Sequence, residues 1–202
     1  MYVRSLFNPR FTRAGCQATH QFTTGTFTTP PSPAPSQSAA PFSFIVFGDM
    51  GVADSAQSTV ANIAADLAAT VSPFSFVLHN GDISYARGED DVWDTWFDLL
   101  EPVMNSLPYQ VTPGNHDLLH SDSGGEDGIP YATRFKMPLN DLSKQRLYYS
   151  FTFNGVFFIQ ISTDDAYDEG SEQYNWLVAE LQEVDRDVTP FVFVTGHKVR
   201  SG

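Results

Sequence analysis

From residue 42 onward, short and almost entirely apolar runs alternate with longer segments whose apolar residues recur at helical spacing. The run at 42–47 has the length and composition of a strand buried on both faces. The segment at 54–70 repeats apolar residues three and four positions apart, as an amphipathic helix does. Because parallel strands need long crossovers between them, this alternation predicts an α/β fold. Strands are expected at 42–47, 74–79, 109–112, 147–153, 156–162 and 191–194, and helices at 54–70, 90–100 and 171–186.

Turn and capping residues refine this pattern. Asn154-Gly155 separates two of the apolar runs and is a strong hairpin signal, so an antiparallel pair is expected within the sheet. Pro102 is expected to end the second helix, because proline clashes with the preceding helical turn. Ser171 is expected to cap the third helix, with Glu172 in its first turn.

The beginning of the chain differs in composition from the rest. Residues 23–41 are rich in proline, serine and threonine, which predicts an extended or disordered linker. Residues 1–40 contain three arginines and no acid, and they lack the continuous apolar core of a secretory signal, so the sequence leaves the cellular compartment open. A folded domain is therefore expected at 42–202, with 1–41 as tail and linker.

Acidic side chains dominate the expected domain. The formal net charge is −13, and all 24 acidic residues lie at or after Asp49. Such a surface repels nucleic acid and anionic membranes, so neither is expected as a partner. No apolar stretch approaches the about 18 residues that a membrane span needs. A small phosphorylated substrate would need a strong local positive charge, which a pair of metal ions would supply. Cys16 is the only cysteine, which excludes an intrachain disulfide and a Cys-rich zinc site.

Three glycine-marked clusters follow three of the expected strands in succession. They read GDMG at 48–51, GDISY at 81–85 and GNHD at 114–117. A histidine, His197, follows the last expected strand. In open α/β sheets, ligands gather where the strands end at their carboxyl edge. We therefore expect four side chains to meet at one rim: Asp49, Asp82, Asn115 and His197.

The donor types in these clusters suit two hard cations that share a carboxylate. Asp82, in the middle cluster, is the natural bridge, and Asp49 would be a terminal ligand. Tyr85 lies three residues after Asp82, and its phenolate would favour a trivalent ion such as iron(III). Asn115 and His197 would suit a divalent zinc, iron or manganese ion. Each cluster alone is most often an ordinary turn, so the prediction depends on all of them occurring in order.

Two further residues are candidates for catalysis. His116 follows Asn115 directly, so its side chain is expected to point elsewhere, toward a phosphate or a leaving alkoxide. Asp117 could hold one ring nitrogen of His116, as carboxylates beside metal ligands often do. Four other polar residues have ordinary structural interpretations: a core or rim position for His79, a solvated position for His120, and a surface turn for Asp164 and Asp165.

The ordered motifs GDMG, GDISY, GNHD and VTGH resemble those of the purple acid phosphatases, a branch of the calcineurin-like metallophosphoesterases. The resemblance extends from residue 42 to residue 198. Gly51 in the first cluster and Tyr85 in the second are typical of the purple branch. Other similar segments are YATRFKMP at 131–138, YYSF at 148–151, IST at 161–163 and GSEQYNWL at 170–177.

The resemblance implies a β-sandwich flanked by helices, preceded in many members by a fibronectin-like domain that residues 16–31 would end. It implies iron(III) on Asp49, Asp82 and Tyr85. It implies a divalent ion on Asp82, Asn115 and His197, with His116 acting on the substrate. The activity that it implies is hydrolysis of phosphomonoesters at acid pH, and its usual compartments are secreted, vacuolar or lysosomal.

The sequence also departs from the family pattern. The family's last cluster, Gly-His-x-His, does not occur, and Lys198-Val199-Arg200 replaces a proline-containing continuation. The expectation is a domain that is incomplete at its C-terminus, with weakened metal sites and little activity in the 202-residue chain. Two alternatives stay open: a catalytically weak or inactive phosphate-binding fragment, and a phosphodiesterase or nucleotidase. The sequence specifies neither the physiological substrate nor the divalent metal nor the oligomeric state.

Overall fold

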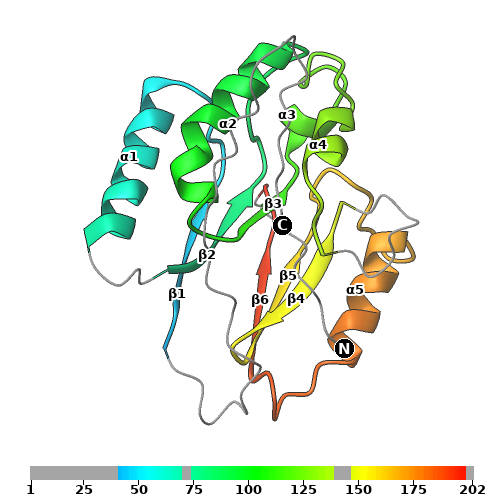
Figure 1. The fold of residues 1–202 in the computed structure, drawn as a ribbon. Helices are drawn as coiled ribbons and strands as arrows, with labels where there is room; N and C mark the ends of the chain where they lie inside the picture. Colours follow the sequence, from blue (N-terminus) through cyan, green and yellow to red (C-terminus); the bar gives the residue numbers. More distant parts are fainter. Residues whose placement is uncertain (1–40, 70–73, 139–146, 199–202) are drawn as a thin grey trace.

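The computed structural model describes residues 41–69, 74–138 and 147–198, which form six strands and five helices (Figure 1). Residues 1–40 of the tail and linker predicted at 1–41, with any fibronectin-like remnant, lie outside the described residues. The strands are β1 (Ser43–Phe47), β2 (Phe74–Asn80), β3 (Tyr109–Thr112), β4 (Tyr149–Phe153), β5 (Val156–Gln160) and β6 (Phe191–Thr195). The helices are α1 (Asp54–Ala69), α2 (Asp90–Met104), α3 (Asn115–Leu118), α4 (Ile129–Arg134) and α5 (Glu172–Gln182).

The first sheet is entirely parallel, in the order β1-β2-β3. The helices α1 and α2 connect its strands, as the alternation in the sequence predicts. All three strands therefore end at the same edge. The loops that follow them carry the three glycine-marked clusters, so the topology alone brings these clusters together.

The second sheet contains the predicted hairpin. The strands β4 and β5 are antiparallel, and the turn residues Asn154 and Gly155 both have positive φ, at 49° and 80°, as a two-residue hairpin turn requires. The strand β6 is parallel to β5 and returns through α5. The sequence pattern predicts the hairpin as part of a single sheet. The structure instead places it in a separate sheet, whose order is β4-β5-β6.

Three apolar clusters show how the layers stack. One, with Trp96 of α2, lies between the first sheet and the helices α1 and α2. A second, with Phe76 and Phe158, joins the two sheets. A third, with Trp176, packs α5 on the second sheet. The result is a β-sandwich with helices on both outer faces, as the family resemblance implies (Figure 1).

Aromatic side chains fill the space between the sheets. On β2, Phe76 and Leu78 face the other sheet while Val77 faces the helices, which is the two-residue alternation of a strand. The Phe76 ring packs on Phe44 at 5.1 Å and edge-on to Phe158 at 5.3 Å, between ring centroids. Such pairs contribute about 0.5–1.5 kcal/mol each beyond the area that they bury. This seam sets the spacing between the sheets.

Helix boundaries differ from prediction in several places. The helix α2 continues through Pro102 to Met104, although Pro102 was expected to end it. Burial of Leu100 and Val103 compensates for the free energy lost with the hydrogen bond that the proline cannot donate. The short helices α3 and α4 were not expected, although Pro130 in the first turn of α4 is a typical start signal. The helix α5 ends at Gln182, and Ser171 caps it as predicted, accepting from the Tyr174 amide. None of the described helices is both long and apolar enough to cross a membrane.

Candidate metal centre

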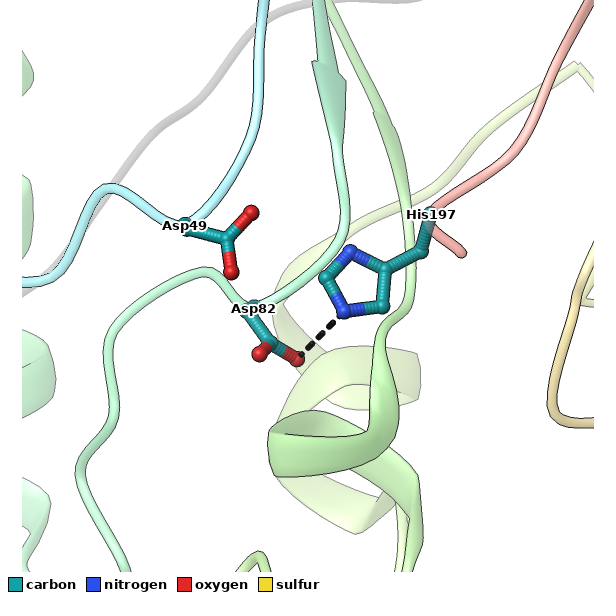
Figure 2. Close-up of side chains that lie close together, drawn as sticks. All are labelled: Asp49, Asp82 and His197. Atoms are coloured by element: carbon teal, nitrogen blue, oxygen red, sulfur yellow. Dashed lines mark ion pairs between the residues drawn. The ribbon is translucent and has the colours of Figure 1, made fainter. Parts of the chain in front are cut away.

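Three side chains from separate strands converge at one edge of the sandwich (Figure 2). Asp49 follows β1, Asp82 follows β2, and His197 follows β6 of the other sheet. One donor atom from each lies within 4.8 Å of the others. His197 Nε2 lies 3.3 Å from Asp82 Oδ1. His197 therefore reaches the rim because the second sheet packs on the first.

The two carboxylate oxygens of Asp82 belong to two different groups of donors. Its Oδ2 accepts a hydrogen bond from the Tyr85 hydroxyl at 3.0 Å, and that hydroxyl is also 3.0 Å from Asp49 Oδ1. Its Oδ1 lies beside His197 Nε2, which is also 3.3 Å from Asn115 Oδ1. Asp82 therefore contacts two groups of donor side chains, one through each of its carboxylate oxygens.

Backbone hydrogen bonds hold the three loops together. The amides of Asp49 and Gly51 donate to the carbonyls of Gly81 and Ile83, at 3.0 and 2.9 Å. The amide of Gly81 in turn donates to the Thr112 carbonyl at 2.9 Å. These bonds extend the parallel pairing of the first sheet beyond its strands, so the positions of the donor side chains are fixed by main chain.

Three of the predicted ligands have a left-handed backbone. The φ angles of Asp49, Asp82 and Tyr85 are 57°, 53° and 57°. Such angles are uncommon outside glycine and are an outlier for a side chain as bulky as tyrosine. Each costs on the order of 1–3 kcal/mol and persists only where the surroundings enforce it, which is frequent at functional sites.

Two glycines make room for the side chains of Asp82 and His197. A Cβ on Gly81, whose φ is 77°, would lie 2.5 Å from Cγ of His197. A Cβ on Gly114 would overlap Oδ1 of Asp82 and lie 2.9 Å from Cδ2 of His197. Both positions therefore need glycine for the carboxylate and the imidazole to approach each other.

Hydrogen bonding fixes the orientation of the His197 ring. Its Nδ1 lies 2.9 Å from the main-chain carbonyl oxygen of Asn80, which can only accept, so Nδ1 carries the proton. Nε2 is then the atom directed at Asp82 and Asn115. A histidine that binds metal through one nitrogen usually donates from the other in this way.

The electrostatics of the cluster favour positive charge. The hydrogen bond with Asp82 raises the pKa of His197 to about 9. Burial and the neighbouring carboxylates of Asp49 and Asp82 raise the pKa of Tyr85. Burial would raise the pKa of Asp82, but the His197 imidazole and the His116 amide lower it below its usual value. Carboxylate, phenol, amide and imidazole donors around such a point fit hard or borderline metal ions.

Comparison with known proteins agrees with this geometry. The model of the calcineurin-like phosphoesterase family matches residues 42–201. The chain belongs to this family.

Within the calcineurin-like phosphoesterases, the similarity is to purple acid phosphatases. The chain is 34% identical to "Probable purple acid phosphatase 20" of Arabidopsis thaliana, over 91% of this chain and 40% of that protein. It is 35% identical to "Probable inactive purple acid phosphatase 9" of the same plant, over 76% of this chain and 29% of that protein. A solved purple acid phosphatase from yellow lupin seeds superimposes with a TM-score of 0.75 and 28% identity, covering 86% of this chain and 32% of that one.

These proteins are considerably longer than this calcineurin-like phosphoesterase. The chain spans between 29% and 40% of the length of the three. Some relatives are named as inactive and others are not. The comparisons therefore establish the family and the fold of this chain.

The structure places His116 at the rim of the centre but separates it from Asp117. The His116 ring packs on Tyr85 at 4.7 Å between centroids, and its Nδ1 lies 2.9 Å from the Asp122 carbonyl. Asp117 is buried beneath the loops, where it accepts from the amides of Gly114 and Ile83 at 2.8 and 3.1 Å. Burial raises the pKa of Asp117 to about 7. The expectation that Asp117 holds the His116 ring is wrong, because backbone amides take up both of its oxygens.

The other polar residues mostly have the expected positions. His79 is fully buried against Phe47, as a core histidine, and His120 is exposed and pairs with Asp127. Asp164 is not on an open surface turn: its side chain is 5% exposed and forms an ion pair with Lys198 at 2.6 Å. The sequence interpretation also missed Asp122, since nothing in the acidic run at 120–130 distinguishes it from its neighbours.

Proposed function

We propose that this chain is the catalytic part of a dinuclear-metal phosphomonoester hydrolase of the purple acid phosphatase type. The observation that carries the proposal is the division of Asp82 between two donor groups. One oxygen accepts from the Tyr85 hydroxyl, which also lies beside Asp49, and the other lies beside His197 Nε2, which also lies beside Asn115 Oδ1. A shared carboxylate is what a pair of closely spaced cations requires.

The residues fit two different ions. Asp49, Asp82 and Tyr85 would hold iron(III), because phenolate and carboxylate oxygens are hard anionic donors. Asp82, Asn115 and His197 would hold a divalent zinc, iron or manganese ion. When bound, such a pair supplies positive charge for the phosphoryl oxygens and makes hydroxide available near neutral pH.

The chain's own residues have separate tasks. The Asn80 carbonyl holds His197 in the tautomer that presents Nε2. The Asp122 carbonyl accepts from Nδ1 of His116, which leaves Nε2 of that ring to pass a proton to the leaving alkoxide oxygen. The ring packing between His116 and Tyr85 keeps this imidazole over the centre.

The charge of the chain limits the substrate. With a formal net charge of −13, the surface repels large polyanions. A small phosphomonoester experiences less electrostatic repulsion from this surface than a large polyanion does. Its single dianionic phosphate group could be bound by a cation pair. This supports a small phosphorylated substrate rather than a nucleic acid or a membrane surface.

A second candidate is a phosphate-binding module with little or no turnover. It is favoured by the similarity to relatives that are named as inactive. Such a module would keep the loops and part of the donor set, bind metal and phosphate, and not hydrolyse the ester.

Hydrolysis of a chromogenic phosphomonoester by the purified 202-residue chain, loaded with iron(III) and zinc, tests the proposal, with metal content measured on the same sample. The proposal predicts bound metal and slow but measurable turnover at acid pH, because the metal sites of this chain are expected to be weakened. The turnover should be abolished in Asp82→Ala and retained in the control His120→Ala, a histidine outside the centre. Bound metal and phosphate without turnover would support the second candidate. Failure to bind metal would overturn both.

A further inference from the structure

Asp122 contacts two neighbouring residues of the centre through two different atoms. Its carboxylate Oδ2 accepts a hydrogen bond from Nδ2 of Asn115 at 2.8 Å. Its main-chain carbonyl lies 2.9 Å from Nδ1 of His116. Asp122 itself is in the loop between α3 and α4 and contributes no atom to the donor groups around Asp82.

The contact with Asn115 determines which end of that amide meets a cation. An asparagine side chain has a donating nitrogen and an accepting oxygen on the same carbon, and rotation by half a turn exchanges them. The carboxylate of Asp122 engages the nitrogen, so Oδ1 lies at the other end, 3.3 Å from His197 Nε2. The reverse orientation would direct the donor NH₂ at the cation site and offer it no lone pair.

The loop that carries Asp122 is well anchored. Glu126, which is buried, accepts from the Trp93 indole at 3.0 Å and from the Gly88 amide at 3.2 Å. The Gly128 amide donates to the Asp117 carbonyl at 2.9 Å. Asp122 is thus part of a rigid connection between α2 and the centre, and its carbonyl is held in place for the His116 ring.

We propose that Asp122 is a positioning residue, which holds the Asn115 amide with its oxygen toward the divalent-ion site and supports the His116 ring through its carbonyl. The predicted effect of Asp122 on metal binding rests on the proposed function. Its predicted effect on the orientation of the Asn115 side chain does not, because that hydrogen bond joins two residues of the chain itself.

The direct test is the zinc affinity of the full 202-residue chain, measured by titration calorimetry. Asp122→Ala should bind zinc about tenfold or more weakly, within the 10–100-fold range typical for residues that orient metal ligands. Asp122→Asn should restore most of the affinity, because its amide oxygen can still accept from Asn115. The matched control is Asp127→Ala, which removes a carboxylate from the same loop and should leave zinc affinity unchanged.

A double-mutant cycle separates an effect through Asn115 from a general loss of charge. If Asp122 acts by orienting Asn115, Asp122→Ala should have no further effect on zinc affinity once Asn115 is alanine. An undiminished effect in the Asn115→Ala background would overturn the proposal, and so would equal losses in Asp122→Ala and Asp127→Ala.

A second measurement tests the positioning role of Asp122 even if the chain binds no zinc. By NMR on the metal-free protein, the side-chain amide protons of Asn115 should be protected from exchange with water, and Asp122→Ala should remove that protection. Absence of zinc binding by the unsubstituted chain would overturn the proposed function. Unchanged amide exchange in Asp122→Ala would overturn the positioning role.

Discussion

The imidazole of His197 donates from Nδ1 to the main-chain carbonyl of Asn80 at 2.9 Å, and this hydrogen bond joins the two sheets at the candidate metal centre. His197 follows β6 in the second sheet, whereas Asn80 ends β2 in the first. The packing between the sheets and the geometry of the centre are therefore linked, and changes to either should be measurable in the other.

Gly81→Ala should displace the His197 ring from Asp82. The new methyl group would lie 2.5 Å from Cγ of His197, at a φ of 77°. We expect zinc binding to be lost and the free energy of unfolding to fall by about 1–3 kcal/mol. Gly170→Ala is the matched control, because its φ is 90° but nothing lies within 4 Å of the added Cβ. It should show the backbone cost in urea unfolding and unchanged zinc affinity. Equal zinc affinity in the two variants would contradict the prediction.

The seam between the sheets should be the most sensitive part of the core. Phe158 is 0% exposed and packs on Phe76 and Phe151. Phe158→Ala should lower the free energy of unfolding by about 3–5 kcal/mol, as for other buried phenylalanines. Phe191→Ala, on β6 at 69% exposed, is the control and should change stability by no more than about 0.5 kcal/mol. Denaturant unfolding of the two variants measures the difference, and similar losses would show that Phe158 is not at the seam.

Much of this fold is readable from the sequence because apolar runs and turn residues act locally. The strand at Tyr109–Thr112 and the cap at Ser171 lie where the pattern predicts them. Local sequence patterns do not predict that the hairpin belongs to a second sheet. That separation depends on Phe76 and Phe158 facing each other across the seam, and an all-apolar strand does not show which of its faces meets which partner.

In the candidate site too, some features can be predicted from the local sequence and others depend on tertiary contacts. Glycine-marked clusters after strands predict that Asp49 and Asp82 meet, because parallel strands end at one edge. The left-handed backbone of Tyr85 and the position of Asp122 come from tertiary hydrogen bonds instead. The wrong prediction for Asp117 has the same cause. Its position next to His116 in the sequence suggested a contact between the two side chains, but the Asp117 carboxylate accepts tertiary hydrogen bonds from the amides of Gly114 and Ile83.

Acid should destabilise the protein in part through His79. Burial lowers the pKa of His79 from 6.5 to about 3, so between these values the unfolded chain binds a proton that the folded chain does not. Stability is therefore lost as the pH falls below 6.5, at about 1.4 kcal/mol per pH unit from this residue. In His79→Gln, which keeps a polar group for the Tyr109 hydroxyl, the loss between about pH 7 and about pH 5 should be smaller by about 2 kcal/mol. Urea unfolding at the two pH values measures this, and parallel losses in variant and parent would contradict it.

Tyr85→Phe should separate the two halves of the proposed metal pair. The substitution removes the hydroxyl that lies 3.0 Å from both Asp49 and Asp82 but keeps the ring that packs on His116. The iron-loaded protein should lose its visible tyrosinate absorption, because that band requires a phenolate oxygen on the metal. Zinc affinity should change little, since His197 lies at the other oxygen of Asp82 and Asn115 lies beside His197. The control is Asn115→Ala, for which we expect the opposite result: the visible band is retained and zinc affinity falls. If both variants lost both properties equally, Asp82 would not divide the centre in two.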